Sequence, residues 1–310
     1  MRISFKWIVA AVLLVFILII AAIYIAIPST LTVSKVEKMN CNTAAAGRVV
    51  NTKWQQLFRQ HNDSNFINKG YTYIFSKKLK NAADIIVNYN DNLYATTLVL
   101  IPLSRDSCIV HWQTTVATGA NPFGRISAYK RAIALKENMN ESLNQLKLFL
   151  EKTSNVYGYN ITPTTLTDTV LISTKRLSKT YPATTEVYNI VHELQGFIHA
   201  NSAIETNYPM LNVTKTDSGY ITMVGIPINK TLPASGDIYP KHLAPMKDKT
   251  LMADVTGGEA IVKQAYQQIE LYMQDHSLRS PVIPFELMIT DRSKEKDTSK
   301  WKTKIYYPII

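Results

Sequence analysis

The sequence predicts an α+β protein with an N-terminal transmembrane helix, and three observations lead to this prediction. The first is an uncharged apolar run near the start. The second is a β-rich region that ends in one long amphipathic helix, and the third is a β–α–β–β pattern that occurs twice near the end. The 310 residues allow two domains beyond the apolar run. With 46% apolar and 18% charged residues, the composition is globular and excludes a disordered or collagen-like chain.

The apolar run extends from Trp7 to Ile27 without a charged residue. As a helix it is about 31 Å long, and the hydrocarbon core of a bilayer is about 30 Å thick. Trp7 and Tyr24 lie near its two ends, where aromatic rings favour the headgroup regions. We therefore predict that residues 1–30 are a transmembrane anchor, with residues 7–27 in the membrane.

A cleaved signal peptide is the alternative interpretation of this run. Signal peptides have an apolar region of about 7–15 residues that ends at a small-x-small site. This run is longer, and it ends at Ile27 and Pro28 without such a site. Arg2 and Lys6 lie closer to the run than the first cations after it, so the positive-inside rule predicts a cytoplasmic N-terminus. The sequence thus indicates a single-pass bacterial membrane protein whose domains lie outside the cytoplasm, in the periplasm.

The two cysteines exclude a disulfide scaffold and a cysteine-rich metal module. Outside the cytoplasm, Cys41 and Cys108 either form one disulfide or stay unpaired, and the sequence leaves both alternatives open.

The middle region contains stretches rich in Val, Ile, Thr and Tyr, separated by polar turns. These stretches predict strands. An amphipathic helix is expected at 126–152, because apolar residues recur there at steps of three and four. We expect an antiparallel sheet with this helix in its concavity. The predicted strands are Tyr71–Phe75, Ile85–Tyr89, Tyr94–Pro102 and Ser107–Thr118, and the predicted buried stripe is Ile126, Tyr129, Ile133, Met139, Leu143, Leu146 and Leu150.

Residues 33–155 resemble the START-like (polyketide cyclase, SRPBCC) helix-grip superfamily. Three segments carry the resemblance: Val110–Trp112, Asn121–Arg125 and Leu143–Glu151. The resemblance implies a sheet that wraps around a hydrophobic cavity. We expect His111 and Trp112 to pack within the sheet rather than to form a site.

An internal repeat organises the end region. The segment Ile221–Ile228 is echoed by Lys302–Ile309, with Pro227 and Pro308 in register. Each segment follows a predicted strand and an amphipathic helix, so each unit is expected to fold as strand–helix–strand–strand and to bury its apolar face against the other. The strands expected before the helices are Thr169–Ser173 and Thr250–Val255, and the helices are Ala183–Asn201 and Gly258–Gln274.

Residues 158–310 resemble the GyrI-like effector-binding domain, which also occurs in AraC- and MerR-type regulators. The matching segments are Gly225–Ile228, Gly257–Glu259, Pro284–Asp291 and Thr303–Ile309. The resemblance implies two halves related by pseudo-twofold symmetry, with a pocket between them that is lined by aromatic rings and holds one buried acidic residue. The sequence departs from the family at Met288, where an aromatic is usual, and at Arg292, where proline is usual.

Glu286 stands where the resemblance places the buried acid, and the ligand-binding residues that it suggests are Glu286, Met288, Tyr208, Tyr266 and Tyr307. A desolvated carboxylate favours a cationic or hydrogen-bonding ligand, and aromatic faces attract cations. The alternative roles of Glu286 are a surface charge on an edge strand or an ion pair with a lysine such as Lys304.

Other motifs do not indicate chemistry. His192 and Glu193 begin a zinc-protease pattern, but Gly196 stands where its second histidine belongs. We expect no metal and no cofactor. The net charge is +11, yet the basic residues near the C-terminus alternate with acidic ones and no DNA-reading helix is evident, so we expect no nucleic-acid partner.

Together these features predict a membrane-anchored protein that binds a small amphipathic or cationic molecule between the two GyrI-like halves and is not an enzyme. Two alternatives remain open at this stage: a hydrolase of reactive small molecules with Glu286 as general base, or a non-catalytic interaction module of the cell envelope. The sequence does not identify a protein partner.

Overall fold

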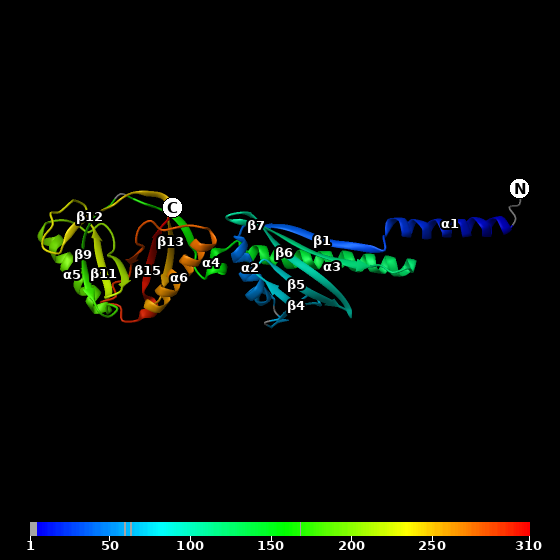
Figure 1. The fold of residues 1–310 in the computed structure, drawn as a ribbon, viewed down its shortest axis with the longest axis horizontal. Coiled ribbons are helices and arrows are strands. Elements are labelled where there is room, and N and C mark those ends of the chain that lie inside the picture. Colours follow the sequence, from blue (N-terminus) through cyan, green and yellow to red (C-terminus); the bar gives the residue numbers. More distant parts are fainter. Residues whose placement is uncertain (1–4, 59, 63, 168) are drawn as a thin grey trace. The chain divides into compact units, whose positions relative to one another are not determined.

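The computed structural model describes residues 5–58, 60–62, 64–167 and 169–310, which belong to two compact units, 1–151 and 152–310 (Figure 1). Each unit combines helices with one antiparallel sheet, and one apolar helix begins the chain. This confirms the predicted α+β class.

Helix α1 (Phe5–Ala26) has no buried residue and is long and apolar enough to cross a membrane. Its C-terminal end contacts the first turn of α3 (Pro122–Leu150) through Arg125. The guanidinium of Arg125 lies 4.3 Å from the ring centre of Tyr24, and its Nη1 donates a 2.7 Å hydrogen bond to the carbonyl of Ile27. Arg2, whose charge enters the prediction of orientation, lies outside the described residues.

A seven-stranded sheet and α3 form most of the first unit. All strands are antiparallel, in the order β1-β7-β6-β5-β4-β3-β2, and α3 packs against β1 and β7. This arrangement fits a helix-grip fold. The four predicted strands and the long helix are present, whereas β1–β3 and the short helices were not predicted. The bounds are β1 (Thr30–Met39), α2 (Thr43–Thr52), η1 (Trp54–Leu57), β2 (Gln60–His61), β3 (Asn65–Asn68), β4 (Tyr71–Leu79), β5 (Ala82–Tyr89), β6 (Asn92–Ser104) and β7 (Ser107–Ala117).

Aromatic rings pack inside this sheet, where the START-like resemblance implies a cavity. Trp54 and Trp112 are fully buried, with their ring centres 5.4 Å apart. Phe66 stacks on Phe58 at 4.0 Å and on Tyr73 at 4.6 Å. Each such ring buries a large apolar area, and ring pairs add about 0.5–1.5 kcal/mol beyond that burial. The cluster therefore contributes strongly to the stability of the unit.

The predicted buried stripe of α3 is correct only in its C-terminal half. Met139 and Leu143 are buried, but Tyr129 and Ile133 are 43% and 42% exposed. The residues buried toward the N-terminal end include Ala128 and Ala132 instead. Small side chains let a helix approach a sheet closely, and a search for large apolar residues overlooks them.

A buried polar network joins α3 to β3 and β4. The hydroxyl of Tyr73 donates to the Asn138 side chain, whose amide donates to the carbonyl of Asn68 at 3.2 Å. The Asn68 amide in turn donates to Ser142 Oγ at 2.9 Å. Since each group is buried, loss of one member leaves others without a partner.

We predict that Asn138→Ala lowers the free energy of unfolding of the first unit by about 1–3 kcal/mol, the cost of unpaired buried polar groups. Asn144→Ala, at an exposed position of the same helix, is the matched control and should stay within about 0.5 kcal/mol of the wild type. Urea unfolding measures both. Equal effects of the two substitutions would contradict the role of the network.

The eight-stranded sheet of the second unit has the order β12-β9-β11-β10-β14-β15-β13-β8. The succession β9–α5–β10–β11 recurs as β13–α6–β14–β15. From one edge of the sheet the order is β12, β9, β11, β10, and from the other edge it is β8, β13, β15, β14, so corresponding strands hold the same places. The strands and helices expected within residues 158–310 are present. The bounds are α4 (Thr153–Tyr157), β8 (Ile161–Leu166), β9 (Thr169–Ser178), α5 (Thr184–Ala200), β10 (Met210–Thr216), β11 (Gly219–Pro227), β12 (Tyr239–Leu243), β13 (Met246–Thr256), α6 (Glu259–Asp275), β14 (Phe285–Met288), η2 (Thr298–Lys300) and β15 (Lys302–Pro308).

The two edge strands are exchanged between the halves. Strand β8 precedes β9 in the chain but pairs with β13, and β12 precedes β13 but pairs with β9. Neither β8 nor β12 is predicted by the sequence patterns. The strand before each β–α–β–β segment thus pairs with the first strand of the other segment. The two segments are therefore linked at both edges of the sheet as well as at its centre.

Helices α5 and α6 each bury one apolar face against the sheet. On α5 the residues Val187, Ile190, Val191, Leu194 and Ile198 are buried, and α5 packs against β9 and β11. Helix α6 buries Val262, Ala265, Ile269 and Met273 and packs against β13 and β15.

Candidate functional site

The central feature of the second unit is a buried ion pair between Glu286 and Arg292. Glu286 lies on β14, an inner strand that pairs with β10 and β15. Its side chain is 9% exposed and that of Arg292 is 10% exposed, and Arg292 Nη2 lies 3.3 Å from Glu286 Oε2. Neither suggested alternative for Glu286 is correct. The residue is not a surface charge, and Lys304 lies 3.7 Å from Asp254 instead.

Three further contacts hold Arg292 in place. Its Nη2 also donates to Thr303 Oγ1 at 2.8 Å, and its guanidinium lies 5.2 Å from the ring centre of Trp301. Its backbone N–H donates to the hydroxyl of Tyr188 at 2.8 Å. The Nε of Arg292 is buried and has no hydrogen-bond partner among the described residues. One buried donor at the ion pair therefore has no partner among the described residues.

Burial raises the pKa of Glu286 above the ordinary carboxyl value. The positive charge of Arg292 offsets part of this rise because it favours the carboxylate, and the charge of Glu259 adds to the rise. Burial also raises the pKa of Tyr181, and the nearby charges of Glu286 and Glu259 act in the same direction. Burial at this site therefore disfavours the ionised forms of both Glu286 and Tyr181.

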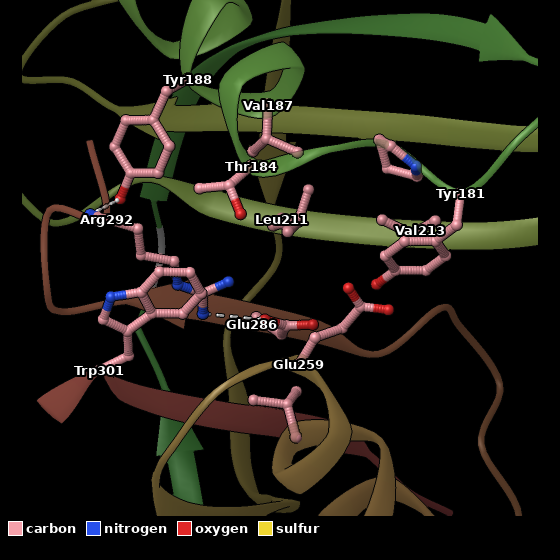
Figure 2. Close-up of a pocket in the computed structure, with 12 residues that line it drawn as sticks. Tyr181, Thr184, Val187, Tyr188, Leu211, Val213, Glu259, Glu286, Arg292 and Trp301 are labelled. Carbon is pink, nitrogen blue, oxygen red and sulfur yellow. Dashed lines mark hydrogen bonds and ion pairs between the residues drawn. The ribbon is translucent and has the colours of Figure 1, made fainter. Parts of the chain in front are cut away.

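A narrow crevice surrounds the ion pair, between the N-terminal parts of α5 and α6 (Figure 2). Its cavity has a volume of about 30 Å³, room for one or two water molecules. Glu259 projects into it from the first turn of α6, and Trp301 lies beside Arg292. The lining residues are Tyr181, Pro182, Thr184, Val187, Tyr188, Leu211, Val213, Glu259, Val262, Glu286, Arg292 and Trp301.

The structure brings only some of the suggested ligand-binding residues together. Met288 is buried on the same face of β14 as Glu286, and it lines a separate cavity with Tyr208, which is 48% exposed. Tyr266 and Tyr307 contact each other, with ring centres 6.3 Å apart, and neither lines the crevice. The charge of Glu286 nevertheless contributes, after burial, to the raised pKa of Tyr266.

Sequence reasoning missed Arg292, Trp301 and Glu259 as site residues. Arg292 drew notice only as a departure from the usual proline, although its position six residues after Glu286 was a usable signal. Glu259 lies in the matching segment Gly257–Glu259, which was a usable signal, whereas Trp301 gave none. Only the folded chain brings the loop that carries Trp301 to the crevice.

No family model matches the chain, and no curated protein matches it. Among solved structures, the EcmrR C-terminal domain is 13% identical, with coverage of 49% of this chain and 98% of that domain and a TM-score of 0.43. The structure of SAV2435 bound to tetraphenylphosphonium is 12% identical, with coverage of 49% and 93% and a TM-score of 0.33. A START superfamily protein from Mycobacterium smegmatis is 15% identical, with coverage of 39% and 94% and a TM-score of 0.26. Similarities at this level of identity and TM-score do not establish a function for the chain.

We predict that the stability of the wild type relative to Glu286→Gln falls as the pH rises from about 4.5 toward neutral. The pKa of Glu286 in the folded protein lies above its reference value of 4.5, so the folded state binds this proton more tightly than the unfolded state does. Stability associated with the protonated carboxyl is then lost as the pH rises through the folded pKa.

Urea unfolding at a series of pH values between 4 and 8 measures this difference. Glu193→Gln, which removes an exposed carboxylate paired with Arg176, is the control for a general effect of charge. A relative stability that increases with pH would mean that the pKa of Glu286 in the folded protein lies below 4.5, contrary to the prediction.

Proposed function

We propose that residues 158–310 form a duplicated GyrI-like module with pseudo-twofold symmetry that binds a small amphipathic or cationic molecule between α5 and α6. The observation that carries this proposal is the buried Glu286–Arg292 pair, which has an unpaired donor and opens to a crevice. We further propose that residues 7–27 anchor the module to a membrane, with both domains outside the cytoplasm.

Strand register supports the symmetry. Leu211 on β10 pairs with Val224, three residues before Pro227. Glu286 on β14 pairs with Ile305, three residues before Pro308. Leu211 and Glu286 therefore hold corresponding positions, and they pair with each other across the two halves. The centre of the module thus has leucine from one half and a carboxylate from the other.

The comparison of Glu286 with Leu211 argues that Glu286 serves binding rather than the stability of the fold. Burying a carboxylate and a guanidinium costs several kcal/mol per ion, and apolar residues of similar volume are often as stable or more stable. Leu211 shows that the corresponding position accepts an apolar residue. A ligand that hydrogen-bonds to the pair offsets the cost of its burial in the bound state.

Entry of a ligand requires the crevice to widen, because about 30 Å³ is too small for an organic molecule. Trp301 is the side chain best placed to move, since it covers Arg292 and is carried by the connection between β14 and β15. Its Nε1 donates to the carbonyl of Glu295 in the same connection at 2.8 Å. Displacement of Trp301 would expose the guanidinium of Arg292.

Arg292 weakens the binding of a cationic ligand, because the ligand must compete with its guanidinium for the carboxylate of Glu286. Removal of Arg292 should therefore increase affinity for cations. The hydrolase alternative stays open, because burial raises the pKa of Glu286, as a general base requires, and the guanidinium of Arg292 offsets only part of that rise.

We predict that Arg292→Gln binds tetraphenylphosphonium at least tenfold more tightly than the wild type, and that Glu286→Gln binds it at least tenfold more weakly. Tetraphenylborate, an anion of the same shape, should show the opposite order. Calorimetric titration of the full chain in one detergent measures all three proteins, with Glu193→Gln as the control. Equal affinities across the variants for both probes would refute binding at the ion pair.

The membrane proposal has a separate test. We expect the full chain to remain in the membrane fraction after washing with salt and alkali, and a chain without residues 1–27 to be released. Alkaline phosphatase fused after Ile310 should be active and green fluorescent protein fused there should not fluoresce, because both report a periplasmic C-terminus. The reverse result with the two fusions would show that the domains are cytoplasmic.

A further inference from the structure

The face of the second sheet that points away from α5 and α6 contains a larger cavity. Leu211 and Ile172 face the helices, so their neighbours Met210 and Leu171 point to the opposite side. There the side chains of β9, β10, β11 and β14 form the floor of a cavity of about 410 Å³, within the range of small-molecule sites. The crevice at Glu286 is a different site, on the other face.

Two segments wall this cavity, and one of them is pinned to the sheet. The Asn212 side chain donates a 2.8 Å hydrogen bond to the carbonyl of Pro284, which fixes the chain around Val282 and Ile283 beside β10. Chain from Lys241 to Met246 forms the other wall. Gly225 leaves space above the cavity floor because it has no side chain, and a Cβ at this position would lie only 2.7 Å from Leu171 Cδ1.

The lining is apolar and adaptable. Met210, Met223 and Met246 contribute three flexible thioether side chains, which suit ligands of irregular or variable shape. Val282 and Ile283 at the rim are 51% and 49% exposed, although both are large apolar residues. A hydrocarbon ligand in the cavity would remove this surface from water, with a gain of about 25 cal/mol per Å².

The charge at the cavity has one sign. Lys241 lines it, with its Nζ 3.1 Å from Met223 Sδ and 5.3 Å from the ring centre of Tyr239. Across the described residues, no carboxylate lines the cavity or lies within ion-pair distance of Lys241. An ammonium group beside an apolar cavity without an internal counter-ion complements a ligand that has a hydrocarbon chain and an anionic head.

We propose that this cavity is a second binding site, which takes a single-chain amphiphile with a carboxylate head such as a long-chain fatty acid. The chain lies over Met210, Met223 and Phe285, and the carboxylate pairs with Lys241. The proposal is independent of binding at Glu286, because the two sites lie on opposite faces of the sheet.

The test uses the full chain in phosphatidylcholine vesicles and hexadecanoate with a diazirine in mid-chain, compared with the amine of the same chain. After photolysis, peptides are mapped by mass spectrometry. Labelling of the peptides that contain residues 241–246 and 282–285 is normalised to labelling of α1, which reports partition into the bilayer. We expect the acid to exceed the amine at least tenfold.

The matched variants are Lys241→Glu and Lys247→Glu. Lys247 is exposed, lies near the same wall and does not line the cavity. We expect Lys241→Glu to lower normalised labelling by the acid at least tenfold, and Lys247→Glu to change it less than twofold. Met223→Trp, which fills the cavity, should abolish labelling. If that variant does not fold, the pair of lysine variants still decides the question.

Equal labelling by acid and amine, or equal effects of Lys241→Glu and Lys247→Glu, would overturn the proposal. A change of oligomeric state in Met223→Trp with labelling unchanged would show an interface between copies of the chain instead. Glu286→Gln should leave this labelling as in the wild type, so failure of binding at Glu286 does not affect the outcome.

Discussion

Two residue pairs join the halves of the second unit at their centre, Met210 with Leu287 and Leu211 with Glu286. The rest of the unit depends on this short contact between β10 and β14, because it places two separate β–α–β–β segments in one continuous sheet. It also decides where Glu286 lies. A residue at the middle of an eight-stranded sheet, on the face that two helices cover, has little access to water whatever its chemistry.

The burial of Glu286 accounts for the arrangement around it. A carboxylate in this position needs a partner, and Arg292 supplies one from the connection that follows β14. Trp301 and Tyr188 then hold Arg292 through a ring contact and a hydrogen bond. The network satisfies most of its polar groups but leaves Arg292 Nε without a partner among the described residues. The buried network of the first unit differs in this respect, since Tyr73, Asn138, Asn68 and Ser142 bond to one another.

The two faces of the second sheet offer different chemistry to other molecules. At the Glu286–Arg292 pair the space is small and the two charged groups are paired with each other. On the opposite face the space is larger, the lining is mostly apolar, and no carboxylate among the described residues lines the cavity beside Lys241. Strand alternation produces both faces from the same strands, because Leu211 and Met210 are neighbours in the chain and point to opposite sides.

Local patterns in the sequence determined the apolar N-terminal helix, the long helix of the first unit and the repeated segments of the second. Composition and periodicity are local properties, and tertiary contacts did not override them in these elements. The resemblance to the GyrI-like domain, rather than any local pattern, placed Glu286 in a predicted pocket between two halves. The alanine-lined part of α3 escaped prediction because small residues give a weak periodic signal.

Tertiary structure alone decided the exchange of β8 and β12, the pairing of Arg292 with Glu286 and the cavity at Lys241. Each depends on segments that are distant in the chain or on the path of a loop. Pairing between such segments is set by the geometry of the whole sheet, and no local preference of the residues encodes it.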